Sequence, residues 1–251
     1  MCLQELTLPL GSYRNMYTNE ANILASWQHN AHFWVDVLDK GELETRRLVT
    51  NEAVIQAVRG ITPAMVLDAG CGEGWLCRAL QQQGIQTVGV DGVAELIQQA
   101  RLKGPGHFEV MSFEEMLERH PWPQALFDAV VFNFCLYGKE LTQHLLQQAL
   151  QWVHPGGKLV LQTLHPYFIT QHPGEKYIDG WRTEQWAGLN RPFTHPYQWY
   201  YRTFSSWLKL VQQAGWQIVE VQEPVHPLSG KPASLLLIAR SKDGRHHIAK
   251  G

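Results

Sequence analysis

The sequence predicts an α/β fold, a doubly wound and mostly parallel sheet of seven strands with a final antiparallel strand. Three observations support this prediction. Strand and helix patterns alternate from residue 64 to residue 164, and right-handed βαβ units with helices on both faces of a sheet produce such alternation. The last two strands are separated only by VHPLSGKP, which is too short for a parallel crossover, so they pair antiparallel. The 251 residues are 45% hydrophobic, enough to bury one large core.

The first segment of the chain, residues 1–62, has no strong strand signal. Helical patterns cover residues 19–38 and 42–60, and a glycine and a proline close the second helix. We expect this segment to form a helical N-terminal cap beside a main domain that spans residues 63–251.

Within the alternating region, each expected element has its own local pattern. Strands are apolar runs bounded by turn residues, and helices carry apolar residues at a spacing of three or four. The strands are expected at residues 65–70, 86–91, 107–112, 127–134 and 158–164. The helices are expected at residues 74–84, 93–104, 113–120 and 139–157, the last two stopped by Pro121 and by a Pro-Gly-Gly run.

Residues 165–201 interrupt the alternation of strand and helix patterns. They hold prolines, glycines, histidines and many aromatic residues without clear periodicity. A structureless connection of that length is uncommon unless it is functional, so we expect an aromatic-rich insertion after the fifth strand that covers the substrate. Order returns with a helix at residues 202–215 and the two final strands at residues 216–224 and 233–241.

Charge and cysteine usage narrow the possible partners and compartments. The formal net charge of -2 shows no electrostatic footprint for duplex nucleic acid. No apolar run approaches the roughly 20 residues needed to span a membrane, and the N-terminus does not resemble a secretory signal. Cys2, Cys71, Cys77 and Cys135 form no C-x-x-C pair. We therefore expect reduced thiols in a cytoplasmic protein, and no metal site.

The stretch AMVLDAGCGEGWLCRAL, residues 64–80, places a glycine-rich loop between the first strand and its helix. A dinucleotide-binding loop has the pattern G-x-G-x-x-G. Gly70 and Gly72 fit its first two positions, but the third falls on Trp75, and the last glycine is Gly74. A phosphate-binding P-loop is excluded because no Gly-Lys-Ser/Thr follows. A nicotinamide-dependent oxidoreductase is therefore disfavoured.

Two acidic residues indicate which ligand this loop suits. Asp68 directly precedes the loop, where a carboxylate repels a pyrophosphate but tolerates an ammonium or sulfonium group. Asp91 ends the second strand, where an acid can accept hydrogen bonds from both hydroxyls of a ribose. The site thus favours an adenosine without phosphates and with positive charge nearby, a description that S-adenosylmethionine meets.

Four stretches in order, VLDAGCGEG, VGVD, FDAVVFNFCL and HPGGKLVLQTLHP, resemble the motifs of the S-adenosylmethionine-dependent methyltransferases with the Rossmann-like seven-stranded fold. The resemblance covers residues 64–165 and indicates the small-molecule type. It implies that the chain binds S-adenosylmethionine and releases S-adenosylhomocysteine. The cofactor-binding residues that it implies are Trp34, Arg47, Asp68, Ala69, Gly70, Cys71, Gly72, Asp91, Gly92, Met111, Ser112, Phe113, Asn133 and Phe134.

The resemblance also implies separate roles within this set. Gly70 and Gly72 would let the backbone approach the methionine part of the cofactor. Ser112 and Phe113 would frame the adenine, and Asn133 would face the transferable methyl group. Each position has a purely structural alternative, since the glycines can make a tight turn and Phe113 can belong to the core.

The expected cap supplies Trp34 and Arg47 of this set, and Thr50 beside them. Trp34, Arg47 and Thr50 fall where small-molecule methyltransferases often close over the cofactor, and Arg47 could pair with the methionine carboxylate. The alternative is that Arg47 is a solvated helix charge beside Arg46.

Methyl transfer mainly requires that the nucleophile and the methyl group are aligned and that water is excluded. A general base is needed only when the acceptor loses a proton. His165 is our candidate, because it follows the fifth strand at the carboxyl edge of the sheet, where ligands bind in open α/β folds. The alternative is that His165 only stabilises a turn.

Aromatic residues are expected to wall the acceptor pocket, which suits an aromatic, lipophilic or cationic small molecule. The alternative is that the insertion needs these rings for a small core of its own. The expected substrate-contacting residues are Tyr137, His165, Trp181, Tyr197 and Tyr200.

Two other functions stay open. One is a methyltransferase acting on RNA or protein, although NFCL after the fourth strand lacks the Asn/Asp-Pro-Pro-aromatic motif of base-amino methyltransferases. The insertion also lacks a basic stripe, because its arginines are offset by acids. The other is a non-catalytic module that binds S-adenosylmethionine.

Overall fold

A computed structural model describes residues 20–118, 126–172, 174–184, 186, 189 and 191–241. The expectations for Cys2, for Pro121 and for both ends of the chain lie outside these residues. No helix in the described ranges is long and apolar enough to cross a membrane.

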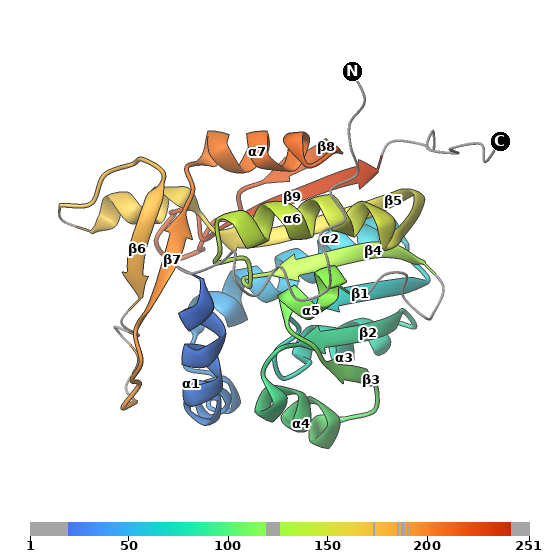
Figure 1. Cartoon of the computed structure of the whole chain (residues 1–251), viewed down its shortest axis with the longest axis horizontal. Helices are drawn as coiled ribbons and strands as arrows, with labels where there is room; N and C mark the ends of the chain where they lie inside the picture. Colours follow the sequence, from blue (N-terminus) through green and yellow to red (C-terminus); the bar gives the residue numbers. More distant parts are fainter. Residues whose placement is uncertain are drawn as a thin grey trace.

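A seven-stranded sheet forms the centre of the molecule, with the strand order β3-β2-β1-β4-β5-β9-β8 (Figure 1). Strands β1 to β5 run parallel, whereas β9 runs antiparallel to both of its neighbours. This arrangement confirms the predicted fold class. The seven strands are β1 (Met65–Ala69), β2 (Gln86–Asp91), β3 (His107–Val110), β4 (Phe127–Asn133), β5 (Val153–Leu164), β8 (Trp216–Gln222) and β9 (Ser234–Ser241).

Helices cover both faces of this sheet because its strands point apolar side chains to both sides. On one face, α2 and α3 pack on Val66, Val131 and Val160. On the other face, α5, α6 and α7 pack on residues such as Leu67 and Leu161. The helices are α1 (Ala21–Asp39), α2 (Asn51–Ile61), α3 (Trp75–Gln81), α4 (Ala94–Lys103), α5 (Phe113–Glu118), α6 (Glu140–Gln148) and α7 (Phe204–Gln213).

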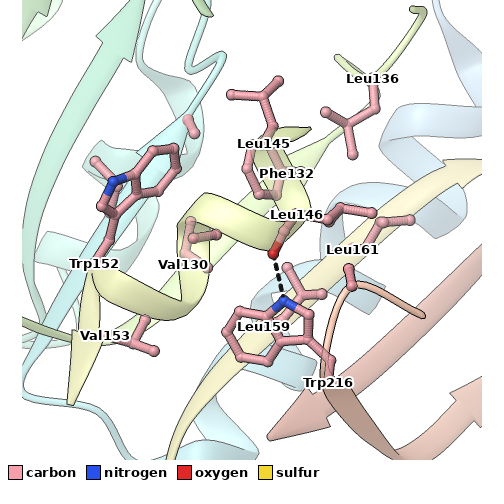
Figure 2. Packing of buried hydrophobic residues seen from close by; sticks show 14 of the residues in the cluster. Val130, Phe132, Leu136, Leu145, Leu146, Trp152, Val153, Leu159, Leu161 and Trp216 are labelled. Carbon is pink, nitrogen blue, oxygen red and sulfur yellow. Dashed lines mark hydrogen bonds between the residues drawn. The ribbon is translucent and has the colours of Figure 1, made fainter. Parts of the chain in front are cut away.

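The larger core lies between β4, β5, β9 and the helices α6 and α7. Figure 2 shows Trp216 in this core, where its indole Nε1 donates a hydrogen bond to the backbone oxygen of Leu146 at 2.7 Å. Trp216 is 2% exposed and Trp152 is fully buried. The single bond satisfies the only polar atom of the Trp216 side chain, which removes the penalty for burying it.

The helix expected at residues 139–157 is shorter than predicted. Helix α6 ends at Gln148, the single turn η3 (Ala149–Gln151) follows, and β5 already begins at Val153. Val153 pairs with Phe127, and a register shift then takes up the Pro-Gly-Gly run before Lys158. The run is therefore a bulge within a strand, because pairing with β4 outweighs the local helical pattern.

The insertion contains more regular structure than its composition predicts. The single-turn helix η4 (Pro166–Gln171) is followed by an antiparallel hairpin of β6 (Gly180–Glu184) and β7 (Tyr197–Tyr201). The strand sequences GWRTE and YQWYY show no alternation of apolar and polar residues, because aromatic rings point to both faces of this hairpin.

The N-terminal helix α1 lies beside the sheet, close to the β6–β7 hairpin and α4 (Figure 1). Ala31 and Val35 pack against Val93 and Leu96 at the start of α4. A π-helical turn, η2 (Arg46–Thr50), then leads into α2. Helix α1 is thus placed across the carboxyl ends of the parallel strands.

Candidate functional site

A cavity of about 590 Å³ opens at the carboxyl ends of β1, β2 and β4. The strand order reverses between β1 and β4, and open α/β sheets bind ligands at such a reversal. Among the residues predicted for the site, those on the cavity wall are Trp34, Asp68, Gly70, Cys71, Gly72, Asp91, Gly92, Ser112, Phe113, Asn133, Phe134 and Tyr137.

One face of α1 forms a roof over this cavity. The residues that line it recur at helical spacing, so a single face of the helix points inward. They are Glu20, just before the helix, then Ile23, Leu24, Trp27, Trp34 and Leu38. Of these residues, only Trp34 was predicted to line the cofactor site. The recurrence of apolar residues every three or four positions is nevertheless visible in the sequence.

The glycine loop follows β1 and brings backbone close to the cavity. Gly70 has a φ of +79°, and a Cβ there would lie 2.6 Å from the Cβ of Cys135. Any side chain at this position would therefore be strained and would collide with the loop after β4. The amides of Gly70 and Cys71 both donate to the oxygen of Val90, which ties the loop to β2.

Asp91 is held rigidly at the end of β2. Its Oδ2 accepts a hydrogen bond from the amide of Gly72, and its Oδ1 accepts one from the amide of Val93, both at 2.9 Å. Burial raises the pKa of the Asp91 carboxyl. Each oxygen keeps a further lone pair, so the carboxylate can still accept two hydrogen bonds from a ligand.

Asp68 points from β1 toward the face covered by α3, and it is 1% exposed. The thiol of Cys77 lies 3.4 Å from its Oδ2. Burial raises the pKa of Asp68 to about 7, with a smaller contribution from the negative charge of Asp91. A buried carboxylate with so few partners is expected to bind a positively charged group.

The raised pKa of Asp68 predicts how stability depends on pH. Asp68 has a pKa of about 3.9 in the unfolded chain and about 7 in the folded chain, so between these pH values only the folded chain holds the Asp68 proton. Binding of this proton stabilises the fold, and that stabilisation is lost as the pH rises through 7. We expect Asp68→Asn to gain about 2 kcal/mol of unfolding free energy relative to the wild-type chain between pH 5 and pH 8. Urea titrations of both proteins at each pH measure this difference, and a constant difference would contradict it.

Residues after β3 and β4 complete the wall. The Ser112 hydroxyl accepts from the amide of Glu115, while the Glu115 carboxylate accepts from the amide of Ser112, a reciprocal cap that begins α5. Two lining residues bear buried oxygens with no hydrogen-bond partner among the described residues, the Oδ1 of Asn133 and the Oγ1 of Thr50. Such atoms are costly unless a ligand or water pairs with them.

The structure places Arg46, rather than the predicted Arg47, on the cavity wall. Arg47 is exposed, whereas Arg46 is partly buried with its Cζ 5.2 Å from the ring centroid of Trp75. Burial lowers the pKa of Arg46, and in the described part of the chain no carboxylate forms an ion pair with it. The Arg46 guanidinium is therefore available to an anionic group of a ligand.

Ala69 and Met111, which the resemblance also implied, do not line the cavity. Both are buried in the large core beside β4, with exposed fractions of 0% and 6%. Ala69 faces the side of the sheet opposite to Asp68, because neighbouring residues of a strand face opposite sides of the sheet.

The structure corrects the prediction of His165 as a general base. His165 is buried outside the cavity wall, and both ring nitrogens are engaged. Nδ1 accepts from the amide of Tyr167, and Nε2 lies 2.7 Å from the Glu223 carboxylate. Since Nδ1 accepts, Nε2 must carry the proton that it donates to Glu223. His165 therefore caps the start of η4, which matches the structural alternative.

Three predicted substrate residues, Trp181, Tyr197 and Tyr200, are also absent from the cavity wall. Tyr197 is buried behind it, with its ring centroid 5.9 Å from that of Tyr137, and Trp181 packs on Tyr200 across the hairpin. The amide of Tyr200 donates to the oxygen of Tyr137 at 2.8 Å. The insertion thus supports Tyr137, which does face the cavity.

Within the described ranges, no group of three or more His, Cys, Asp or Glu side chains is arranged to hold a metal ion. Cys71, Cys77 and Cys135 are free thiols, and burial raises the pKa of each of them.

Comparisons with known proteins agree with this geometry. Residues 44–221 match a family model described as a methyltransferase domain. Ubiquinone biosynthesis O-methyltransferase of Xylella fastidiosa strain M23 is 30% identical over 132 residues, 47% of this chain and 50% of its own. The mitochondrial protein of the same name from Rattus norvegicus is 25% identical over 223 residues, 78% of this chain and 61% of its own. The chain thus matches about half to three fifths of the length of these relatives.

Solved structures share the fold at lower identity. The 1,6-didemethyltoxoflavin-N1-methyltransferase of Burkholderia thailandensis, solved with bound 1,6-didemethyltoxoflavin and S-adenosylhomocysteine, has a TM-score of 0.63 and 21% identity. That likeness covers 89% of this chain and 88% of the other. Because the family model spans more than half of the sequence and includes the glycine loop, the chain belongs to the methyltransferase domain family.

Proposed function

We propose that this chain transfers the methyl group of S-adenosylmethionine to a small apolar acceptor and releases S-adenosylhomocysteine. The observation that carries this proposal is the set of opposite charges around one cavity. Asp68 near the end of β1 and Asp91 at the end of β2 lie beside the glycine loop, and Arg46 faces the same space without an ion pair to a carboxylate in the described ranges. A ligand with an ammonium, a ribose and a carboxylate complements all three groups.

The residues present fit this cofactor. Asp91 would accept the ribose hydroxyls, Asp68 would face the amino group, and Arg46 would bind the carboxylate. The unpartnered oxygens of Asn133 and Thr50 would accept hydrogen bonds from donors of the bound ligand or from water. When bound, S-adenosylmethionine supplies an electrophilic methyl group on a sulfonium. The protein then has to align the acceptor and exclude water, which is the task of the α1 roof.

The acceptor is expected to be aromatic or lipophilic. The wall also has a large apolar part that includes Trp27 and Tyr137, whose rings stack with centroids 6.0 Å apart. Leu141, Leu145 and Leu164 also line the wall. A wall of this kind suits a flat apolar molecule better than an extended polyanion.

The comparisons support the proposed reaction class and cofactor. The relatives are O-methyltransferases by name, and a structural neighbour was solved with S-adenosylhomocysteine.

We further propose that the protein acts in the cytoplasm and that duplex nucleic acid is not its partner. We also propose that residues 1–62 form a cap and residues 63–251 the catalytic domain. Within that domain, residues 165–201 would form an insertion that supports the acceptor pocket from behind.

Calorimetric titration of the purified protein with S-adenosylmethionine, S-adenosylhomocysteine and NAD tests the proposal. We expect micromolar binding of both adenosyl ligands and no binding of NAD. Binding of NAD alone would overturn the cofactor assignment. Binding of S-adenosylmethionine without turnover of any phenol, amine or thiol acceptor would instead favour a non-catalytic module, and turnover only with RNA or protein would favour a macromolecular substrate.

Arg46 and Arg47 form a matched pair for a second test. Among the described residues, Arg46 supplies the only guanidinium that lines the cavity, so we expect Arg46→Ala to bind S-adenosylhomocysteine about tenfold more weakly. Arg47→Ala removes the same charge from an exposed neighbouring position and should leave the affinity within twofold. Calorimetry at one salt concentration measures both variants. An equal loss in the two would mean that only the overall charge matters.

A further inference from the structure

Glu20 joins two parts of the molecule that are far apart in the sequence. It directly precedes α1 and is 3% exposed. Its Oε1 accepts hydrogen bonds from the amides of Lys139 at 2.5 Å and Glu140 at 2.9 Å, and its Oε2 accepts one from Leu141 at 3.3 Å. These amides lie at the start of α6, where no backbone oxygen of the helix can reach them. The carboxylate of one helical segment therefore caps another.

The residues around Glu20 allow its carboxylate to approach the start of α6 closely. A Cβ at Gly138 would lie 2.5 Å from the Oε2 of Glu20, so only glycine permits the close approach. Arg202 supports the same loop from the other side, because its Nη2 donates to the oxygen of Lys139 at 2.8 Å. Burial raises the pKa of Glu20, and the charges of Arg202 and Glu140 also act on this carboxylate.

Helix α1 is anchored differently farther along. Asn30 accepts a hydrogen bond from the amide of Thr194 at 3.0 Å, and Ser26 donates to the oxygen of His195, so its middle is tied to the insertion. Lys103 on α4 pairs with Asp39 at the last turn. Glu20 thus attaches the beginning of the roof to the α/β domain by hydrogen bonds, beside the apolar packing of Leu24 on that domain.

We propose that Glu20 is a positioning residue that keeps α1 closed over the cofactor cavity. The inference rests on the proposed function, since the bound molecule is taken to be S-adenosylmethionine or its product. The roof residues Ile23, Leu24 and Trp27 follow Glu20 within two turns, so release of the carboxylate from α6 frees this part of the wall. A loosened roof lets the cofactor leave faster and admits water to the site.

Two variants test this inference together. Glu20→Ala removes all three hydrogen bonds, whereas Glu20→Gln keeps an oxygen that can accept from Lys139 and Glu140. We expect S-adenosylhomocysteine to dissociate about tenfold faster from Glu20→Ala, equivalent to about 1.4 kcal/mol, and less than threefold faster from Glu20→Gln. Glu52→Ala removes an exposed glutamate from α2 and serves as the matched control. Stopped-flow displacement measures the rates.

Hydrogen exchange on the free proteins gives a readout that needs no ligand. In Glu20→Ala, amides in the first two turns of α1 should exchange about tenfold faster, while those of β1 and β4 stay unchanged. Unchanged exchange in α1 would overturn the role of Glu20, and so would equal effects of Glu20→Ala and Glu52→Ala. If wild-type protein binds no S-adenosylhomocysteine but α1 still loosens in Glu20→Ala, the proposed function fails while the attachment of the roof stands.

Discussion

Asp91→Ala is expected to weaken binding of S-adenosylhomocysteine by about 100-fold. The change removes a buried carboxylate that can accept two hydrogen bonds from the ribose, and hydrogen bonds to a charged group contribute about 1.5 to 3 kcal/mol each. It also releases the amides of Gly72 and Val93, which loosens the glycine loop in the same direction. About 2.8 kcal/mol corresponds to a 100-fold change in Kd. Calorimetry on the wild-type and variant proteins measures this loss.

Two controls separate a local effect from misfolding. Glu220→Ala removes an exposed carboxylate from β8, far from the glycine loop in strand order, and should leave Kd unchanged. A thermal melt of Asp91→Ala without ligand shows whether the fold survives. If Asp91→Ala stays folded and binds S-adenosylhomocysteine with unchanged affinity, the ribose assignment at the end of β2 is wrong.

Trp216→Ala is expected to cause the largest loss of stability. The side chain is 2% exposed and packs in the core that Figure 2 shows, beside Leu146 and Leu159. Deleting a buried Trp costs about 3 to 5 kcal/mol, because a cavity remains and the apolar contacts are lost. In a chain of this size, about 4 kcal/mol corresponds to a fall in Tm of about 8 to 16 °C.

Two matched variants separate the contributions of packing and hydrogen bonding to this loss of stability. Trp216→Phe keeps most of the apolar volume but leaves the oxygen of Leu146 without its hydrogen bond, so about 1 to 3 kcal/mol is expected. Val219→Ala on the same strand is half exposed and should change stability by less than about 0.5 kcal/mol. Calorimetric scans compare the three variants. A loss in Val219→Ala as large as that in Trp216→Ala would contradict the packing argument.

The sequence sufficed for the sheet, the glycine loop and the two acids. Alternating strand and helix patterns determine a parallel sheet because βαβ units have one hand. Strands β1 and β2 end at the same edge, so Asp68 and Asp91 had to lie near one another. These inferences need only local patterns and the direction of the strands.

Only the tertiary structure decided which arginine lies on the cavity wall and whether His165 lies there. Neighbouring helical residues point about 100° apart, so an error of one position moves a side chain from the cavity to solvent. The π-helical turn η2 contains Arg46 and Arg47, and its different period made that phase unpredictable. The local pattern around His165 also could not show that Glu223, 58 residues later in the chain, lies beside its second ring nitrogen.

The α1 roof and the contact of Glu20 also belong to the tertiary structure. The sequence predicted the helix and, of the α1 residues that line the cavity, only Trp34. That the carboxylate of Glu20 caps a helix 119 residues away depends on packing between distant segments. Local patterns are set by neighbours along the chain, whereas the walls of a cavity are set by which surfaces meet when the chain closes around its core.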